Sequence, residues 1–165
     1  MDKYYYIISQ LPTLFFAKSA EITVESFLDE AEKWMNEKDF SILSKLDMND
    51  YLFKKREPKT LIAYKEFEHK LRHDLAQFRE AKKKDTEYKP VSFSISLVKE
   101  GNPLEIEIKL MELRWKVLDE MQREHHFDLE YLILYFLQLQ ILQRYFKFNK
   151  EEGLKNFQKL YEVTL

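Results

Sequence analysis

The chain has 165 residues, with 27 Lys and Arg against 29 Asp and Glu, so its net charge is −2. This near balance gives no overall field to attract nucleic acid or an anionic membrane, and a hydrophobic content of 45% excludes a wholly disordered chain. The absence of Cys excludes disulfides, thiol nucleophiles and Cys-ligated zinc, and with only 2 Gly the many tight turns of a β fold are unlikely.

The opening segment, MDKYYYIISQLPTLFF, is rich in aromatic residues. Ser9, Gln10 and Pro12 interrupt its apolar run and its start carries no net positive charge, so we expect part of the mature fold rather than a secretion signal. We also expect Pro12 to end a first helix and to direct residues 14–16 back across the domain.

Three consecutive tyrosines, Tyr4, Tyr5 and Tyr6, lie in this first helix. Successive residues of a helix turn by about 100°, so the three rings cannot share one buried stripe. We therefore expect at least one ring to face another element or a partner, and we take all three as candidates for a partner interface.

Two helices are expected next, at about 24–35 and 39–45. Thr23 can cap the first of them, and Glu25 lies in its first turn, where the helix dipole favours a carboxylate. The apolar stripe of that helix comprises Phe27, Leu28, Ala31, Trp34 and Met35.

A long helix is predicted over about 59–82, preceded by Pro58. Its apolar residues recur at heptad spacing: Tyr64, Phe67, Leu71, Leu75 and Phe78. Residues 54–84 hold 11 basic and 5 acidic side chains, which makes this region a basic helical arm, about 58–84, flanked by two runs. The runs, Lys54, Lys55 and Arg56, and Lys82, Lys83 and Lys84, are further candidates for an interface with an acidic partner.

The stretch VSFSISL near 91–98 alternates apolar and polar residues, the pattern of a strand. A lone strand has nothing to pair with, so we expect a short extended segment packed against the helices. A helix should follow from Pro103 to about Glu124, started by Asn102 as N-cap.

Asp128 is expected to cap a helix over 129–146 that is apolar nearly all the way round. A buried central helix is favoured over a membrane span, because its Gln and Arg side chains would be costly in lipid. Asn149 and Glu152 resemble a capping box and predict a final helix with Leu154, Phe157, Leu160 and Tyr161 facing inward.

The histidines give weak signals for chemistry. His69 and His73 are spaced i, i+4, yet both point away from the apolar stripe of their helix and lack the Glu of HExxH, so we expect solvated surface residues. His125 and His126 follow the Pro103 helix, where a helix-end role is favoured over catalysis because no partner carboxylate is identified.

Two charged residues, Glu107 and Arg114, fall on the narrow polar strip of the Pro103 helix. They are about 10 Å apart along the axis, so we expect each to bind a residue on another helix. There is no Gly-rich phosphate loop and no GxSxG, so we predict a protein that is not an enzyme, with no catalytic residues, no cofactor and no metal.

Two blocks of the sequence resemble one uncharacterised bacterial family encoded among the subunits of V-type (A/V-type) ATP synthases. The blocks are YYYIISQLPTL with ESFLDEA and DFSIL, and the stretch from 101 to 157 with NPLEIE, LRW, LDE, HHFDLE, YFLQLQILQRY and EEGLKNF. The middle, about 50–100, departs from the family by being shorter, which puts any function located there in doubt. The family is in turn reminiscent of the C/d component of V-type ATPases, a helical protein that seats the rotor shaft on the membrane ring.

We therefore expect an all-α, single-domain bundle of about six helices over 1–165. The resemblance implies a non-catalytic subunit or assembly factor of a V-type ATP synthase, with a C/d-like coupling element of the central stalk as one form. It also implies V-type ATP synthase subunits as partners and a cytoplasmic location, with attachment to the membrane through the ATPase complex left open. The alternative is a helical nucleic-acid-binding protein that uses the 54–84 arm, and an enzyme based on His125 or His126 ranks below both.

Overall fold

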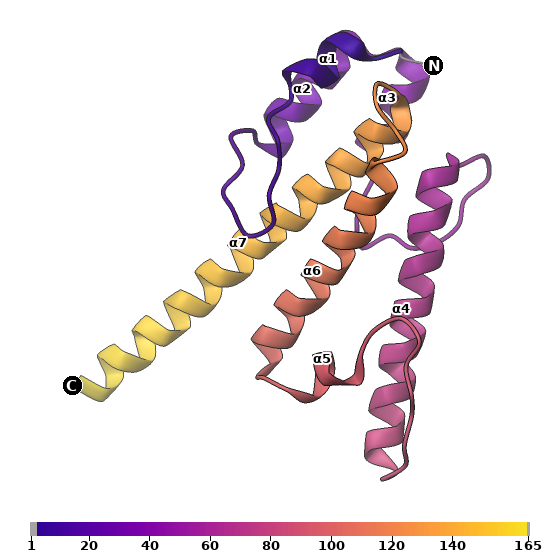
Figure 1. Cartoon of the computed structure of the whole chain (residues 1–165). Helices are drawn as coiled ribbons and strands as arrows, with labels where there is room; N and C mark the ends of the chain where they lie inside the picture. Colours follow the sequence, from indigo (N-terminus) through magenta and orange to yellow (C-terminus); the bar gives the residue numbers. More distant parts are fainter. Residues whose placement is uncertain (1–2, 165) are drawn as a thin grey trace.

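The computed structural model describes residues 3–164, with side chains as far as Lys150. Within these residues there are seven α-helices and no strand, and 66% of the chain is helical, which confirms the all-α prediction with one helix more than expected (Figure 1). The helices are α1 (Tyr5–Gln10), α2 (Val24–Trp34), α3 (Glu37–Ser44), α4 (Lys59–Lys83), α5 (Ile95–Lys99), α6 (Pro103–Gln122) and α7 (Leu129–Thr164).

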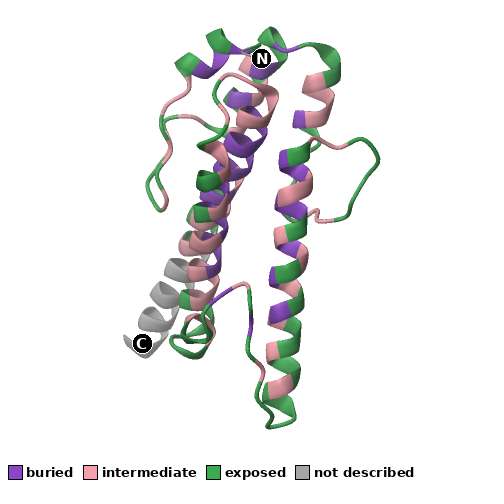
Figure 2. Cartoon of the chain, turned by 45° about the vertical axis from the view of Figure 1, so that its right-hand side comes forward, coloured by how far each residue is buried: buried purple, intermediate pink, exposed green. Residues whose placement is uncertain are grey.

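The first part of α7 is the centre of the molecule. Residues 132–139 are all buried, because α2, α3, α4 and α6 all pack against α7 (Figures 1 and 2). A helix that is apolar nearly all round can only be stable with such cover, so the sequence of α7 requires its central place. No helix in the described residues combines the length and apolarity needed to cross a bilayer.

A glutamine of α7 shows how a polar residue is accommodated in this core. Gln140 accepts a hydrogen bond from the backbone N–H of Met48 (2.7 Å) and donates one to the carbonyl of Leu46 (2.8 Å). It thereby satisfies two backbone groups in the turn after α3, which would otherwise be costly to bury.

The N-terminal segment is fastened to the C-terminal half. Tyr4 donates its backbone N–H to the carbonyl of Phe127 (2.8 Å), and the Tyr135 hydroxyl donates to the carbonyl of Pro12 (2.6 Å). Beyond Pro12 the chain turns back along the bundle, and Phe16 packs against Trp115 (ring centroids 5.9 Å apart). The predicted role of Pro12, after the end of α1 at Gln10, is therefore confirmed.

The lower half of α4 belongs to a second, smaller core. Its buried centre comprises Leu71 of α4, Leu110 of α6, and Phe93 from the segment before α5. Residues 85–94 run back along α4, and α5 then lies between the ends of α4 and α6 (Figure 1). The segment 85–94 is called the strap below.

Three predicted caps are confirmed. The Thr23 hydroxyl accepts from the N–H of Ser26 (3.1 Å), and the Asn102 side chain accepts from the N–H of Glu105 (2.9 Å). Asp128 accepts from the N–H of Tyr131 (2.8 Å). These side chains satisfy N–H groups that have no partner within the helix.

The prediction of an extended segment at 91–98 is wrong for its second half. Residues 95–99 form α5, and Val91 is 93% exposed while Phe93 is buried, so the alternation does not place one face inward. The physical reason is that no neighbouring strand is present in the described residues, and the backbone bonds locally instead, for example from Leu97 N–H to Ser94 O (3.0 Å).

The prediction of a separate final helix is also wrong, because α7 continues without a break from Leu129 to Thr164. A helix in progress already supplies carbonyl acceptors for the N–H groups after Asn149, so no new cap is required. The predicted inward residues Leu154, Phe157, Leu160 and Tyr161 lie outside the residues whose side chains are described. Similarly, α3 begins at Glu37 rather than 39, because Asn36 caps it (Asp39 N–H to Asn36 Oδ1, 2.8 Å).

Candidate interaction surface

The first of the three candidate tyrosines is in the core. Tyr4 is only 4% exposed, and its hydroxyl donates to the carboxylate of Asp39 and accepts from Asn36 Nδ2 (3.2 Å). Burial, together with the contact to Asp39, raises the pKa of Tyr4 above its ordinary value. Tyr4 therefore fixes α1 to α3, and as an interface candidate it is corrected to a structural residue.

The same contact changes the titration of Asp39. Burial tends to raise the pKa of this carboxyl, but the hydrogen bonds from Tyr4 and Lys3 outweigh burial and hold the pKa below its usual range. Lys3 Nζ lies 3.2 Å from Asp39 Oδ2. The charged form of Asp39 is therefore the form that the fold stabilises.

The other two tyrosines are exposed. Tyr5 is 62% and Tyr6 is 52% exposed, and each ring packs against a ring from another segment. Tyr5 contacts Phe127 of the α6–α7 turn (centroids 4.5 Å apart), and Tyr6 contacts Trp34 at the end of α2 (4.4 Å). Trp34 is itself 50% exposed. We call Tyr5, Tyr6, Trp34 and Phe127 the aromatic end surface.

The aromatic end surface has the chemistry of a protein interface. Tyr and Trp are enriched at such interfaces, where a large ring adds apolar contact and its polar group can still bond. Rings that already pack in pairs lose less side-chain freedom when a partner binds. Sequence reasoning missed the participation of Trp34, because it assigned this residue to a buried stripe. It assigned no role to Phe127.

The two basic runs lie at opposite ends of α4. Lys54, Lys55 and Arg56 precede the helix and Lys82, Lys83 and Lys84 end or follow it, all exposed. The 25 residues of α4 span about 37 Å at ~1.5 Å per residue, so the runs do not form one patch. Two of these residues are paired, Lys54 with Asp50 (2.9 Å) and Lys84 with Glu80 (3.2 Å).

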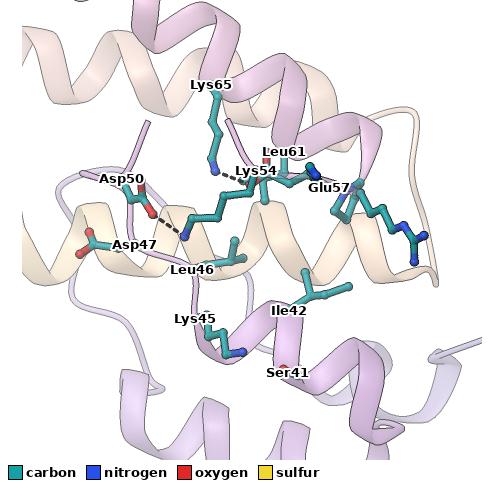
Figure 3. Close-up of a pocket in the computed structure, with 13 residues that line it drawn as sticks. Ser41, Ile42, Lys45, Leu46, Asp47, Asp50, Lys54, Glu57, Leu61 and Lys65 are labelled. Atoms are coloured by element: carbon teal, nitrogen blue, oxygen red, sulfur yellow. Dashed lines mark hydrogen bonds and ion pairs between the residues drawn. The ribbon is translucent and has the colours of Figure 1, made fainter. Parts of the chain in front are cut away.

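A cavity of about 180 Å³ lies beside the first run, between α3, the 45–58 loop and the start of α4 (Figure 3). Its wall is mixed in charge: Lys45, Lys54, Lys55, Arg56 and Lys65 against Asp47, Asp50 and Glu57. The buried Lys65 pairs with Glu57 and donates to the carbonyl of Leu52 (2.7 Å), which holds the loop on α4. This arrangement accounts for the loop's position and favours no particular ligand charge.

A groove of about 970 Å³ lies beside the second run. The last turns of α4, including Phe78, form one wall, and the strap, including Tyr88 and Phe93, forms the other together with α5. The strap is held by Asp74, which accepts from the Tyr88 hydroxyl (2.8 Å) and from the N–H groups of Val91 (3.1 Å) and Ser92 (2.7 Å).

A buried ionic cluster joins α4 to α6, and sequence reasoning missed its acidic member. Glu68 is 0% exposed and receives hydrogen bonds from Arg114, Arg72 (3.0 Å) and the Tyr64 hydroxyl (3.3 Å). The spacing of the residues does indicate a buried Glu68, since it lies four residues after Tyr64 and three before Leu71, within the apolar stripe.

The prediction that Glu107 and Arg114 each bind a residue on another helix is confirmed. Arg114 pairs with Glu68 of α4, and Glu107 pairs with Arg144 of α7 (3.0 Å). The contact with Glu68 raises the pKa of the Arg114 guanidinium, against the opposing effect of its burial, so it stays charged. The polar strip of α6 therefore carries structural pairs on both sides.

The prediction for His69 is wrong and that for His73 is right. His73 is exposed, but His69 packs flat on Phe53 (centroids 4.8 Å, interplanar angle 10°) and edge-on to Tyr51 (5.2 Å). The 50–57 loop folds over this part of α4 and covers the ring. A helical wheel of α4 alone could not reveal a loop that returns onto its polar side.

His125 has the partner carboxylates that the sequence did not identify. Its Nδ1 lies 2.8 Å from Asp128 Oδ2 and 3.2 Å from Glu130 Oε2, at the turn between α6 and α7. The three side chains are each about a quarter exposed. His126 is exposed beside them. Both histidines lie in the turn after α6, which ends at Gln122.

Comparison with known families adds a limited result. Residues 93–163 match a family described as a protein of unknown function (DUF2764). This region includes α5, α6, the α6–α7 turn and almost all of α7, and it is less than half of the chain. No curated protein and no solved structure matches the chain.

Proposed function

We propose that this protein is a non-catalytic subunit or assembly factor of a V-type (A/V-type) ATP synthase, and that it binds a neighbouring subunit through the aromatic end surface. The observation that carries the proposal is the exposure of Tyr5, Tyr6 and Trp34, each by half or more, on two adjoining helices. The resemblance of the two sequence blocks to a family encoded with these ATP synthases supplies the identity of the complex.

The aromatic end surface suits a stable contact rather than a transient one. The neighbouring Tyr4 is buried and fixes the position of α1. Its hydroxyl donates a hydrogen bond to Asp39, and its backbone N–H donates one to the carbonyl of Phe127. A surface held in this way needs little reorganisation on binding, so more of the contact energy contributes to affinity. Clustered Tyr and Trp residues are also the types that dominate interface energetics.

The shape of the bundle supports the more specific form of the proposal, a C/d-like coupling element. An unbroken helix of 36 residues, α7, is about 54 Å long at ~1.5 Å per residue. Four other helices, α2, α3, α4 and α6, pack against it, and ion pairs link α6 to both α4 and α7. A part that passes torque between a shaft and a membrane ring needs this kind of stiffness.

The proposal is tested by co-purification from native membranes with the catalytic A and B subunits of the ATPase. We expect the wild-type chain to co-purify and a Tyr6→Ala, Trp34→Ala double variant to be lost from the complex while keeping its thermal unfolding temperature. The matched control is Phe15→Ala, because Phe15 is a comparable ring, 56% exposed, outside the aromatic end surface.

Two results would contradict the proposal. Consistent absence of the wild-type chain from the ATPase would exclude the complex, and equal recovery of the double variant would exclude the surface. Retention of RNA or DNA that falls steeply with salt would instead support nucleic-acid binding by the basic runs.

A further inference from the structure

We propose that His125, Asp128 and Glu130 bind a divalent transition-metal ion of the zinc type at the α6–α7 turn. The site is formed entirely within this chain. It goes beyond the proposed role in an ATP synthase and does not depend on it.

The three ligand atoms converge on one point. His125 Nδ1 lies 2.8 Å from Asp128 Oδ2 and 3.2 Å from Glu130 Oε2, and all three atoms lie within 4.8 Å of one another. Zinc bonds of about 2.0–2.2 Å to N and O, at tetrahedral or octahedral angles, separate neighbouring ligand atoms by roughly 3.0–3.5 Å. The two separations from His125 Nδ1 are close to this, and that between the two carboxylate oxygens is within 4.8 Å, so side-chain movements would complete the coordination.

Proton counting also favours a cation at this point. Nδ1 of the imidazole can carry one proton, yet it faces two carboxylate oxygens, each of which is an acceptor. One proton cannot make a full hydrogen bond to both. A divalent ion bonds all three atoms together and offsets the repulsion between the two carboxylates.

The outer atoms of the same residues are held in place by other groups. Asp128 Oδ1 accepts from the N–H of Tyr131 (2.8 Å), and Glu130 Oε1 accepts from the N–H of Thr60 (3.4 Å). His125 Nε2 lies 3.5 Å from the hydroxyl of Thr60. Bonds of this kind orient metal ligands and fix the tautomer of a ligating histidine.

The donor set indicates the class of ion. One imidazole nitrogen with two carboxylate oxygens suits Zn²⁺, Co²⁺ or Mn²⁺ better than Ca²⁺, which prefers oxygen ligands alone. Three protein ligands leave a position for water or for a donor from a partner. Because Thr60 lies in the first turn of α4, a bound ion would also tie the α6–α7 turn to α4.

The test is titration of the purified, metal-free full chain with Zn²⁺ by calorimetry, and with Co²⁺ by visible absorption. We expect one ion per chain and a thermal unfolding temperature that rises with Zn²⁺. In His125→Gln, and separately in Glu130→Gln, we expect affinity to fall by about 10- to 100-fold or more. Asp128 is left intact because it also caps α7.

The matched controls are His126→Gln, an exposed neighbour, and His73→Gln, which breaks the i, i+4 pair on α4. Both should bind like the wild type. Metal-free circular dichroism shows whether each variant is folded, and Glu130→Gln decides the result if His125→Gln is not. The proposal is overturned if no saturable binding is seen at about millimolar Zn²⁺, or if His73→Gln removes binding and the two site variants do not.

Discussion

Replacement of Glu68 should be strongly destabilising. Glu68 is fully buried on α4 and forms an ion pair with Arg114 of α6. Glu68→Gln removes the negative charge and leaves the Arg114 charge buried without compensation, which typically costs about 3–5 kcal/mol. Urea unfolding should show this loss, whereas Glu66→Gln, an exposed change on the same helix, should alter stability by less than about 0.5 kcal/mol.

A double variant tests whether the cost of Glu68→Gln comes from the buried charge that is left on Arg114. Replacing both partners, Glu68→Leu with Arg114→Met, should recover most of the lost stability, because a well-packed apolar pair of similar volume avoids burying ions. If Glu68→Gln is as stable as the wild type, the cluster is more hydrated than its burial indicates and the charge of Glu68 is not needed to compensate Arg114.

Asp39 should make stability depend on pH in the acid range. Its pKa is held below the ordinary value in the folded protein, so the unfolded chain takes up a proton at a higher pH than the folded one. The stabilisation is therefore full above the ordinary Asp pKa and is lost as pH falls through the lower, folded value. Denaturant unfolding between neutral and acid pH should show a shallower acid loss in Asp39→Asn, while Asp29→Asn, exposed on α2, should retain the wild-type slope.

At the scale of elements, the strap is held to α4 mainly through one side chain. Asp74 accepts from Tyr88, Val91 and Ser92, and these bonds outweigh burial and hold its pKa below the usual range. Asp74→Ala should free the strap, with a cost of about 1.5–3 kcal/mol because the hydrogen bonds are to a charged group. The measurement is hydrogen exchange.

The amides of Val91 and Ser92 should exchange faster in Asp74→Ala, while those in the buried part of α7 should be unchanged. Glu80→Ala, an exposed change in the same helix, is the control. Equal protection of the strap in both variants would mean that Phe93 alone anchors it.

The helices themselves were largely predictable, because local rules decide them. The caps Thr23, Asn102 and Asp128 act within three residues of their own position, and the stripe of α4 follows from periodicity. The predictions failed at 91–98 and at Asn149, where the same local pattern fits two structures. There the presence of a pairing strand or of a helix already in progress decided the result.

At the scale of the whole molecule, the candidate site was only partly predictable. The sequence indicates that three adjacent tyrosines cannot all be buried, but which one is buried depends on Asp39 and Asn36, more than thirty residues away. The convergence of His125 with Glu130 depends on how the turn folds, and the cover of His69 depends on a returning loop. Contacts of this kind belong to the tertiary structure and leave no local pattern.

The link between Tyr135 and Pro12 has a consequence for synthesis. The two residues are 123 positions apart, and Phe16 similarly has its ring partners, Trp115 and Tyr145, late in the chain. At ribosomal rates of about 5–20 residues per second, the segment from Pro12 to Phe16 stays without these late partners for up to roughly 6–25 s after it is made. During that interval this segment is a ready target for chaperones, and the synthesis of α7, which carries Tyr135 and Tyr145, ends their access.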